Sequence, residues 1–511
     1  MMEDRVIIIR KKLETFLRNK YNLMFVGIIL FAFIIRLYYF FQTYNQPLWW
    51  DEAEYFSITK SILSIAPYDY PVQRPILFPL IMAFFYIFTH SEAFVRFMVV
   101  LLPSMGCVVM TYLVGKELYN KKVGLISSFI MSVFWVLMFN TFRVHTDALA
   151  LFFGLLAIYF FWKGYVEKKS TKLLFLAAIF IALAFLVRVF YLIIIPIFLI
   201  FLLITERLNF LKEKKIWYAA LSSLILVVPY LIWSFIKFGD PLAFLYGYIT
   251  PDALSVHATR AIPWMLIWDV LKIYMHWVYL VLFFFGLLTL IDLVLGFDLV
   301  LKNKRKVLKS DLFIVINILA VVFFFMFVFR VMGEPRWLIF MAPALFFIIA
   351  KGLVKIYHLL SKYHKVLALI VILLLLFSGA FQEIKYGDSI INAKKSSYLE
   401  LKEAGLWIKH NSLDGGVIFT KSVPQITYYA ERESVGIQSI EEEFEKEIRE
   451  LKPKYMILSV FEVHSETMLN YPQQYPNILK PVQAYFADSE QTQPLLVIYE
   501  FTGYEFENST L

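Results

Sequence analysis

The sequence predicts an α-helical polytopic membrane protein with about eleven transmembrane helices and additional juxtamembrane helices, followed by a C-terminal extracytoplasmic α/β domain. The first observation is composition, because 60% of the 511 residues are hydrophobic and only 17% are charged. A soluble domain is about 45–50% apolar. The second observation is the recurrence of long apolar runs. The third is a change near residue 383, after which charges are dense and short β-rich runs appear.

Eleven apolar runs approach or reach the roughly 20 residues that cross a bilayer as a helix. They are residues 22–42, 93–115, 123–140, 147–162, 173–187, 189–205, 216–236, 277–300, 312–330, 337–351 and 366–382. The run at 76–89 differs, because it has only about fourteen residues and lies between Arg74-Pro75 and His90. We expect this run to be an interfacial or re-entrant helix.

Basic residues test this assignment, because lysine and arginine accumulate in the cytoplasmic loops of membrane proteins. With a cytoplasmic N-terminus, the inner segments hold 26 Lys and Arg residues and the outer loops of the membrane part hold 10. A full span at 76–89 would invert every later loop. We therefore expect a multi-pass plasma-membrane protein with a cytoplasmic N-terminus. The net charge of +9 reflects this orientation and does not indicate a nucleic-acid partner.

The same orientation places the C-terminal part outside. It predicts a transmembrane domain at 1–382 and a soluble extracytoplasmic α/β domain at 383–511. Within the second domain, strands are expected at 417–420, 455–460 and 495–501, and helices at 397–410 and 440–451. The long outer loop at 237–276 is compatible with an amphipathic helix on the membrane surface and with a lid over an acceptor.

Acidic and basic residues recur where spans meet the outer boundary. Asp51 and Glu52 follow the first span and two tryptophans, and Arg74 opens the interfacial helix. Carboxylates are costly near hydrocarbon unless they are paired or used. The alternative is structural: an aromatic belt with a solvated acidic turn that caps a helix, and an arginine that anchors the helix at the headgroups.

Later outer loops add further polar residues. Asp147 stands where a span begins, and its alternative role is a carboxylate that interacts with the helix dipole. The others are arginines with a histidine and a glutamate nearby, namely Arg143, His145, Arg188, Arg330, Glu334 and Arg336. Carboxylates and arginines at one boundary suit a reaction in which a carboxylate takes a proton from a hydroxyl while cations hold a phosphate.

Other chemistries lack their motifs. The sequence contains no phosphate-binding P-loop, no Gly-rich dinucleotide motif, no HExxH and no GxSxG, and its single cysteine is Cys107. A zinc site is not expected, because the eight histidines are scattered. We expect no required cofactor. A divalent metal is compatible with the scheme but not predicted.

Several segments, taken in order, resemble the GT-C class of membrane glycosyltransferases, in particular the branch with protein O-mannosyltransferases and aminoarabinose lipid A transferases. The matching segments are Asp51-Glu52, Arg74-Pro75-Ile76-Leu77, Ser91-Glu92-Ala93-Phe94-Val95-Arg96, Asp147-Ala148-Leu149, Ala184-Phe185-Leu186-Val187-Arg188, Glu334-Pro335-Arg336-Trp337-Leu338 and Glu403-Ala404-Gly405-Leu406-Trp407-Ile408 with 424–430. Trp49-Trp50-Asp51 also matches the WWD motif of oligosaccharyltransferases. That motif lies in their C-terminal domain, so we interpret this match as coincidence and keep glycan transfer of the oligosaccharyltransferase kind as the less favoured alternative.

The resemblance implies a GT-C-like fold, a polyprenyl (dolichyl) phosphate sugar donor and Asp51 as the general base. We expect an inverting hexosyl or pentosyl transfer to a hydroxyl on a protein, lipid or glycan. Glu52 and Asp147 would orient Asp51, the acceptor or a neighbouring cation. The lipid phosphate would lie near Arg74, Arg188 and Arg336. Further candidates for substrate contacts are His145, Arg143, Arg330 and Glu334.

Two alternatives belong to other classes. A non-enzymatic flippase or transporter of a polyprenyl-linked sugar would also place arginines near a lipid phosphate. It would not need a carboxylate pair beside an acceptor route or a large exported domain. A receptor on an inert anchor would not need eleven spans.

Overall fold

The computed structural model describes residues 18–245, 263–301, 306–329, 334–412 and 415–504. Contacts divide the chain into two compact units. The first comprises Met1–Gln42, Pro71–Phe78 and Ala93–Asn392, and the second comprises Thr43–Tyr70, Pro79–Glu92 and Ala393–Leu511. The expected domain boundary at residue 382 therefore falls within the first unit. The second unit also takes in two segments of the first predicted outer loop.

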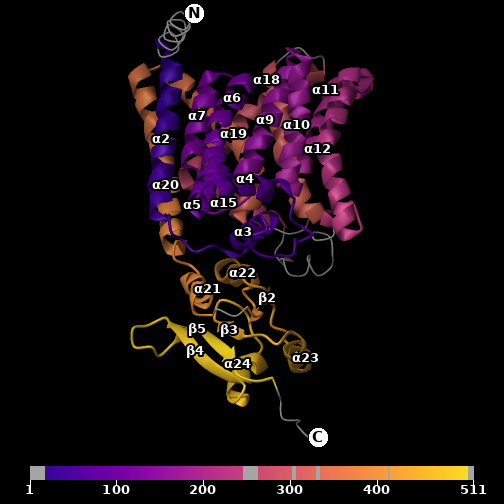
Figure 1. Cartoon of the computed structure of the whole chain (residues 1–511). Helices are drawn as coiled ribbons and strands as arrows, with labels where there is room; N and C mark the ends of the chain where they lie inside the picture. Colours follow the sequence, from indigo (N-terminus) through magenta and orange to yellow (C-terminus); the bar gives the residue numbers. More distant parts are fainter. Residues whose placement is uncertain (1–17, 246–262, 302–305, 330–333, 413–414, 505–511) are drawn as a thin grey trace, which may run out of the picture. The chain divides into compact units, whose positions relative to one another are not determined.

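The helices of the first unit run side by side (Figure 1). They are α2 (Lys20–Gln42), α5 (Glu92–Arg96), α6 (Leu102–Leu118), α7 (Lys121–Val133), α8 (Trp135–Thr141), α9 (Asp147–Phe161), α10 (Thr171–Val187), α11 (Ile194–Glu206), α12 (Lys214–Phe238), α15 (Pro263–Leu287), α16 (Ile291–Leu295), α17 (Phe297–Leu301), α18 (Lys306–Phe323), α19 (Ala342–Leu360) and α20 (Lys365–Lys394). Short π-helical or 3-10 segments extend several of them, at Phe97–Leu101, Trp162–Val166, Val189–Ile193, Arg207–Lys212, Leu288–Leu290, Phe324–Phe329 and Pro335–Met341.

Within the described residues, nine helices are long and apolar enough to cross a membrane, and Lys121–Val133 with Trp135–Thr141 makes a tenth if this pair, bent by 52°, is one span. The polytopic helical fold is therefore confirmed. One of the eleven expected spans, at 173–187, is not among these ten. It corresponds to Thr171–Val187, which has 17 residues and is one of the shorter apolar helices. The run expected to be interfacial forms α4 (Leu77–Thr89), a helix of 13 residues.

Two element boundaries differ from the expectation. A helix begins at Pro263 and breaks at His276, where φ is 42°. Within the loop expected at 237–276, residues 263–275 are therefore helical. Residues 246–262 lie outside the described chain. The span expected to end at 382 continues to Lys394, because its polar residues find partners. Glu383 accepts a hydrogen bond from the Trp135 amide at 3.2 Å, and Asp388 accepts one from the Tyr39 hydroxyl at 2.9 Å.

Close packing of α15 against α19 requires glycine at two positions of the bundle. A Cβ atom on Gly286 would lie 2.4 Å from the Ile348 carbonyl oxygen, and one on Gly352 would lie 2.9 Å from the Cα of Gly286. Helices α15 and α19 can therefore cross at this distance only because both positions lack a side chain.

The second unit contains a five-stranded sheet with the order β2-β1-β3-β5-β4. Its strands are β1 (Ile418–Thr420), β2 (Ser434–Val435), β3 (Tyr455–Ser459), β4 (Leu479–Phe486) and β5 (Pro494–Phe501), and its helices are α3 (Trp50–Ile62), α4, α21 (Leu399–Asn411), α22 (Val423–Ala430), α23 (Glu441–Leu451) and α24 (Glu466–Gln474). β1 pairs in parallel with β2 and β3, whereas β5 is antiparallel to both β3 and β4.

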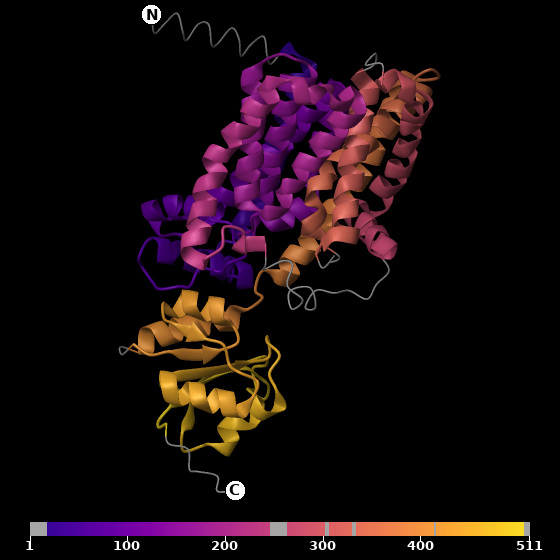
Figure 2. The same ribbon diagram turned by 90° about the vertical axis from the view of Figure 1, so that its right-hand side faces the viewer.

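Helices cover both faces of this sheet (Figure 2). The side chains of β3 illustrate how each face forms a core. Successive side chains of a strand point to opposite faces. Tyr455 and Ile457 pack into a core with residues of α21 and α22. Met456 and Leu458 pack into a second core with residues of α23 and α24. The α/β character expected from the sequence follows from this three-layer arrangement.

Candidate active site

The acidic pair of the first predicted outer loop opens helix α3. The Glu52 carboxylate accepts a hydrogen bond from the backbone N–H of Trp49 at 2.7 Å and is fully buried. It therefore satisfies a backbone donor at the helix N-terminus, as an acidic residue in the first turn commonly does. Asp51 is only partly buried. Of the two carboxylates, Asp51 is the one that solvent reaches.

Helix α3 is anchored to helix α22 within the second unit. Lys60 lies at the far end of α3, and its ammonium is 2.7 Å from Glu431 Oε1 and 4.0 Å from the centre of the Tyr428 ring. Before the helix begins, the Leu48 amide donates to the Tyr429 hydroxyl at 2.9 Å. These contacts fix α3 at both ends. The C-terminal part of the chain therefore positions the helix that carries Asp51.

The charge of Glu431 is stabilised in this contact. Burial alone would raise the pKa of its carboxyl, but hydrogen bonds from Lys409 and Lys60 outweigh burial and lower the pKa below the ordinary value of 4.5. Lys409 lies 2.7 Å from the second carboxylate oxygen. Glu431 is thus ionised at neutral pH and bridges two lysines.

A second group of charges lies in the first unit, where Asp147 begins α9, Arg188 ends α10 and Arg336 precedes α19. Arg188 Nη1 is 2.7 Å from Asp147 Oδ1, and Arg336 Nη1 is 3.9 Å from Asp147 Oδ2. Asp147 is fully buried, whereas the arginine side chains are 13% and 14% exposed. We call Asp147, Arg188, Arg336 and Glu334 the Asp147 cluster. Its buried carboxylate holds two guanidinium groups at one end of the bundle.

Neighbouring groups fix the arginines of this cluster. Arg188 also donates to the Thr146 hydroxyl at 3.2 Å. Arg336 Nε lies 2.5 Å from a carboxylate oxygen of Glu334, whose side chain is 50% exposed. The Tyr274 hydroxyl donates to the Pro335 carbonyl and so fastens the turn that carries Arg336. Thr146 and Tyr274 were not among the residues expected from the sequence, because an isolated hydroxyl gives no signal there.

The remaining candidates are placed as follows. Arg143 and His145 are buried in the turn before α9, and His145 Nδ1 lies 2.9 Å from the Asn140 side-chain oxygen. Arg74 is partly buried in the segment Pro71–Phe78 of the first unit. Arg330 lies outside the described residues.

The structure thus brings Asp147, Arg188, Arg336 and Glu334 together. Asp51 and Glu52 belong to the second unit, and a site shared with the Asp147 cluster stays a prediction. In the chain as described, no three His, Cys, Asp or Glu side chains gather into a metal-binding group. The expectation that no cofactor is required also stays a prediction. Of the roles considered for Asp147, the short contact with Arg188 favours the one in which Asp147 orients a neighbouring cation.

Comparisons with known proteins support the resemblance found in the sequence. Residues 73–233 match the family model described as dolichyl-phosphate-mannose-protein mannosyltransferase. The matched segment includes Arg74, Asp147 and Arg188. A search among curated proteins found no match.

The chain is also similar to solved structures. For the oligosaccharyltransferase of Archaeoglobus fulgidus in the apo form, the TM-score is 0.62 at 13% identity, over 86% of this chain and 69% of that chain. For the same enzyme tethered with an acceptor peptide, the TM-score is 0.60 at 14% identity, over 96% of this chain and 75% of that chain. For ArnT from Cupriavidus metallidurans bound to undecaprenyl phosphate, the TM-score is 0.62 at 10% identity, over 92% of this chain and 98% of that chain. These similarities confirm the GT-C-like fold and the GT-C resemblance predicted from the sequence.

Proposed function

We propose that this chain, whose fold is that of the GT-C membrane glycosyltransferases, moves a hexose or pentose from a polyprenyl (dolichyl) phosphate carrier to a hydroxyl acceptor on the outer membrane face. The transfer inverts the anomeric centre, and Asp51 is the general base. The observation that carries this proposal is the Asp147 cluster, because two guanidinium groups held at the end of a helix bundle suit a lipid-linked phosphate.

The charges of the cluster allow an anionic ligand to exchange with Glu334. The two carboxylates of Asp147 and Glu334 balance the two guanidinium groups of Arg188 and Arg336. Asp147 is fully buried, whereas Glu334 contacts Arg336 from a half-exposed position, so a donor phosphate can take the place of Glu334 and meet one unbalanced positive charge. Each guanidinium has five N–H donors in a planar fork that matches phosphate oxygens. Arg74 is the third candidate for this phosphate.

The reaction needs one proton transfer and one displacement. The Asp51 carboxylate accepts the proton of the acceptor hydroxyl while that oxygen forms a bond to the anomeric carbon. The bond between the anomeric carbon and the phosphate oxygen breaks, and its electron pair leaves with the polyprenyl phosphate. Arginines at the phosphate stabilise the charge that develops on this leaving group.

The structural neighbours support a donor and an acceptor of this general kind. ArnT from Cupriavidus metallidurans was crystallised with undecaprenyl phosphate, and the Archaeoglobus fulgidus oligosaccharyltransferase was crystallised with an acceptor peptide. A lipid phosphate and a separate acceptor are the two substrates that the proposed reaction requires.

The proposal is tested with the purified full-length protein in proteoliposomes that contain a radiolabelled polyprenyl-phosphate sugar. We expect Asp51→Asn to lower the transfer rate by about 10²–10⁴-fold, the usual contribution of a general base, and to leave donor binding intact. The matched control is Asp69→Asn, because Asp69 is an exposed carboxylate of the same unit. Near-normal transfer by the Asp51 variant would remove it from the mechanism. Movement of the intact labelled lipid without release of polyprenyl phosphate would indicate a transporter.

A further inference from the structure

A cavity of about 550 Å³ with apolar and charged lining residues lies within the first unit, among α7, α16, α18 and α19. Its lining includes Lys351 and Lys355, which lie toward the C-terminal end of α19. Arg336 of the Asp147 cluster precedes the N-terminal end of the same helix. Nineteen residues at 1.5 Å each separate Arg336 from Lys355 by roughly 30 Å. The cavity is therefore at the opposite end of the bundle from the Asp147 cluster.

The inner part of the cavity has an unsatisfied carboxylate oxygen. Asp311 is fully buried and lines the cavity. Its Oδ1 accepts hydrogen bonds from the Tyr119 hydroxyl at 2.7 Å and from the Lys351 ammonium, whereas Oδ2 has no hydrogen-bond partner among the residues that the structure describes. A buried charged acceptor without a donor is unfavourable. A ligand that reaches this depth should therefore present a hydrogen-bond donor.

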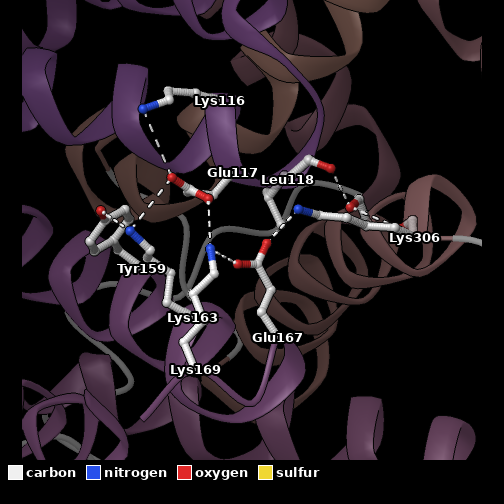
Figure 3. A network of polar contacts seen from close by, with 9 residues as sticks. Lys116, Glu117, Leu118, Tyr159, Lys163, Glu167, Lys169 and Lys306 are labelled. Carbon is white, nitrogen blue, oxygen red and sulfur yellow. Dashed lines mark hydrogen bonds and ion pairs between the residues drawn. The ribbon is translucent and has the colours of Figure 1, made fainter. Parts of the chain in front are cut away.

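Lysines outnumber acidic residues among the exposed charges of the cavity. Lys306, Lys355 and Asp292 are exposed and line it, and Lys306 also contacts Glu167. Glu167 belongs to a network in which four lysines, Lys116, Lys163, Lys169 and Lys306, contact Glu117 or Glu167, and Lys169 contacts both (Figure 3). Four cations around two carboxylates leave positive charge in excess beside the cavity. The outer part therefore favours an anionic group.

The surroundings indicate that this ligand comes from the membrane. The cavity lies at the ends of the apolar helical stretches Ile267–Leu295, Lys306–Val328 and Pro335–Leu360, each of which can cross a bilayer. Val307, which lines the cavity, is 51% exposed, and Val294 and Leu295, on the same helix as the lining residue Asp292, are 77% and 79% exposed. Such side chains suit acyl chains and disfavour water. Basic pockets between transmembrane helices are known binding sites for anionic lipid headgroups.

We propose that this cavity binds the headgroup of an anionic phospholipid that carries hydroxyl donors, as phosphatidylglycerol does. The phosphodiester lies against Lys355 and Lys306. The glycerol hydroxyls reach inward, where one donates to Asp311 Oδ2. The bound lipid contacts α18 through Lys306 and Asp311 and α19 through Lys355, so it stabilises the folded bundle by mass action.

The test uses the full-length protein, purified in detergent and depleted of lipid. Binding is measured by native mass spectrometry and by the rise in unfolding temperature with phosphatidylglycerol, phosphatidylcholine, glycerol phosphate and inorganic phosphate as separate probes. We expect Lys355→Glu to weaken phosphatidylglycerol binding by about tenfold or more, the effect of losing one charge-assisted contact. The matched control is Lys362→Glu, because Lys362 is exposed beyond the end of α19 and does not line the cavity.

Asp311→Asn is a second variant, for use if it folds. It keeps one side-chain oxygen but replaces the other carboxylate oxygen by an NH2 group, which cannot accept a hydrogen bond from the glycerol hydroxyl, so we expect it to lower the preference for phosphatidylglycerol over phosphatidylcholine. The assignment is overturned if the two phospholipids bind equally or if both lysine variants lose binding equally. It is also overturned if glycerol phosphate or inorganic phosphate stabilises the protein as well as the lipid does.

Discussion

The Asp147 cluster allows a prediction that can be worked out from distances. At an effective dielectric constant of 20, opposite unit charges attract by about 6 kcal/mol at the 2.7 Å between Asp147 and Arg188. At the 3.9 Å between Asp147 and Arg336 the attraction is about 4 kcal/mol. Desolvation of the fully buried carboxylate offsets much of both. Arg188 is therefore the principal partner of Asp147, and Arg336 is the weaker one.

The perturbation is Asp147→Asn, alone and combined with Arg188→Gln. The asparagine retains the shape of the side chain and removes the charge that holds the guanidinium. If Asp147 acts by holding Arg188 against the donor phosphate, each single change should lower kcat/KM by about 10²–10³-fold, the effect of removing one preorganised donor. The double variant should be close to the more impaired single variant, because both changes remove the same interaction.

The assay is the release of polyprenyl phosphate from a labelled donor, with kcat and KM determined separately. A matched control is Lys237→Met, which removes an exposed positive charge at the end of α12. A double-mutant cycle compares the double variant with its two single variants. We expect the coupling energy between Asp147 and Arg336 to be smaller than that between Asp147 and Arg188. If the effects of Asp147→Asn and Arg188→Gln multiply in the double variant, the two residues act independently and Asp147 does not act by holding Arg188.

Three further predictions concern other parts of the chain. Glu334→Gln should lower the KM for donor by about two- to fivefold, the effect of an exposed ion pair; an unchanged or higher KM would show that Glu334 does not compete with the phosphate. The lowered pKa of Glu431 means that its ion pairs contribute stability in full above pH 4.5 and lose it as pH falls through the lower folded pKa. Thermal unfolding should therefore show a loss in acid that Glu431→Gln lacks; equal acid sensitivity would contradict this. Gly286→Ala should lower the unfolding temperature, because its Cβ would meet the Ile348 carbonyl at 2.4 Å, whereas Gly27→Ala, with nothing within 4 Å, should not. Similar unfolding temperatures for the two variants would contradict the tight helix crossing.

The membrane architecture was largely predictable from the sequence, because apolar runs and basic loops carry strong signals. The errors occurred where polar residues lie within helices. Asp269 and Lys272 form an ion pair at 2.7 Å on adjacent turns of α15, so these charges do not interrupt the helix that begins at Pro263. Glu383 and Asp388 likewise find partners on other helices, which allows α20 to continue past 382. Such partners are distant in the sequence and cannot be read from it.

The C-terminal strands were predicted where hydrophobic residues are continuous, as in β3 and β5. β2 has only two residues, and β4 is interrupted by Pro481 and a β-bulge. Periodicity does not reveal strands of this kind.

The candidate site was predicted in part. Asp147, Arg188 and Arg336 were identified because charged residues at the ends of apolar runs are conspicuous, and the structure brings them together. The contact between Lys60 and Glu431 joins residues 371 positions apart, and no local pattern indicates it. It also reveals that α3 packs with the C-terminal part of the chain, an association that span counting had not indicated.

The most direct test of the proposed function follows both products of a single reaction. The purified protein is given a polyprenyl-phosphate sugar labelled in the sugar, together with acceptor material from its own membranes, and the sugar and the free polyprenyl phosphate are quantified over time. We expect labelled acceptor and polyprenyl phosphate to appear in equal amounts, and Asp51→Asn to lower the rate of both by about 10²–10⁴-fold. Labelled lipid that crosses the bilayer intact, with no polyprenyl phosphate released by the unaltered protein or any variant, would contradict a glycosyl transfer and indicate a transporter.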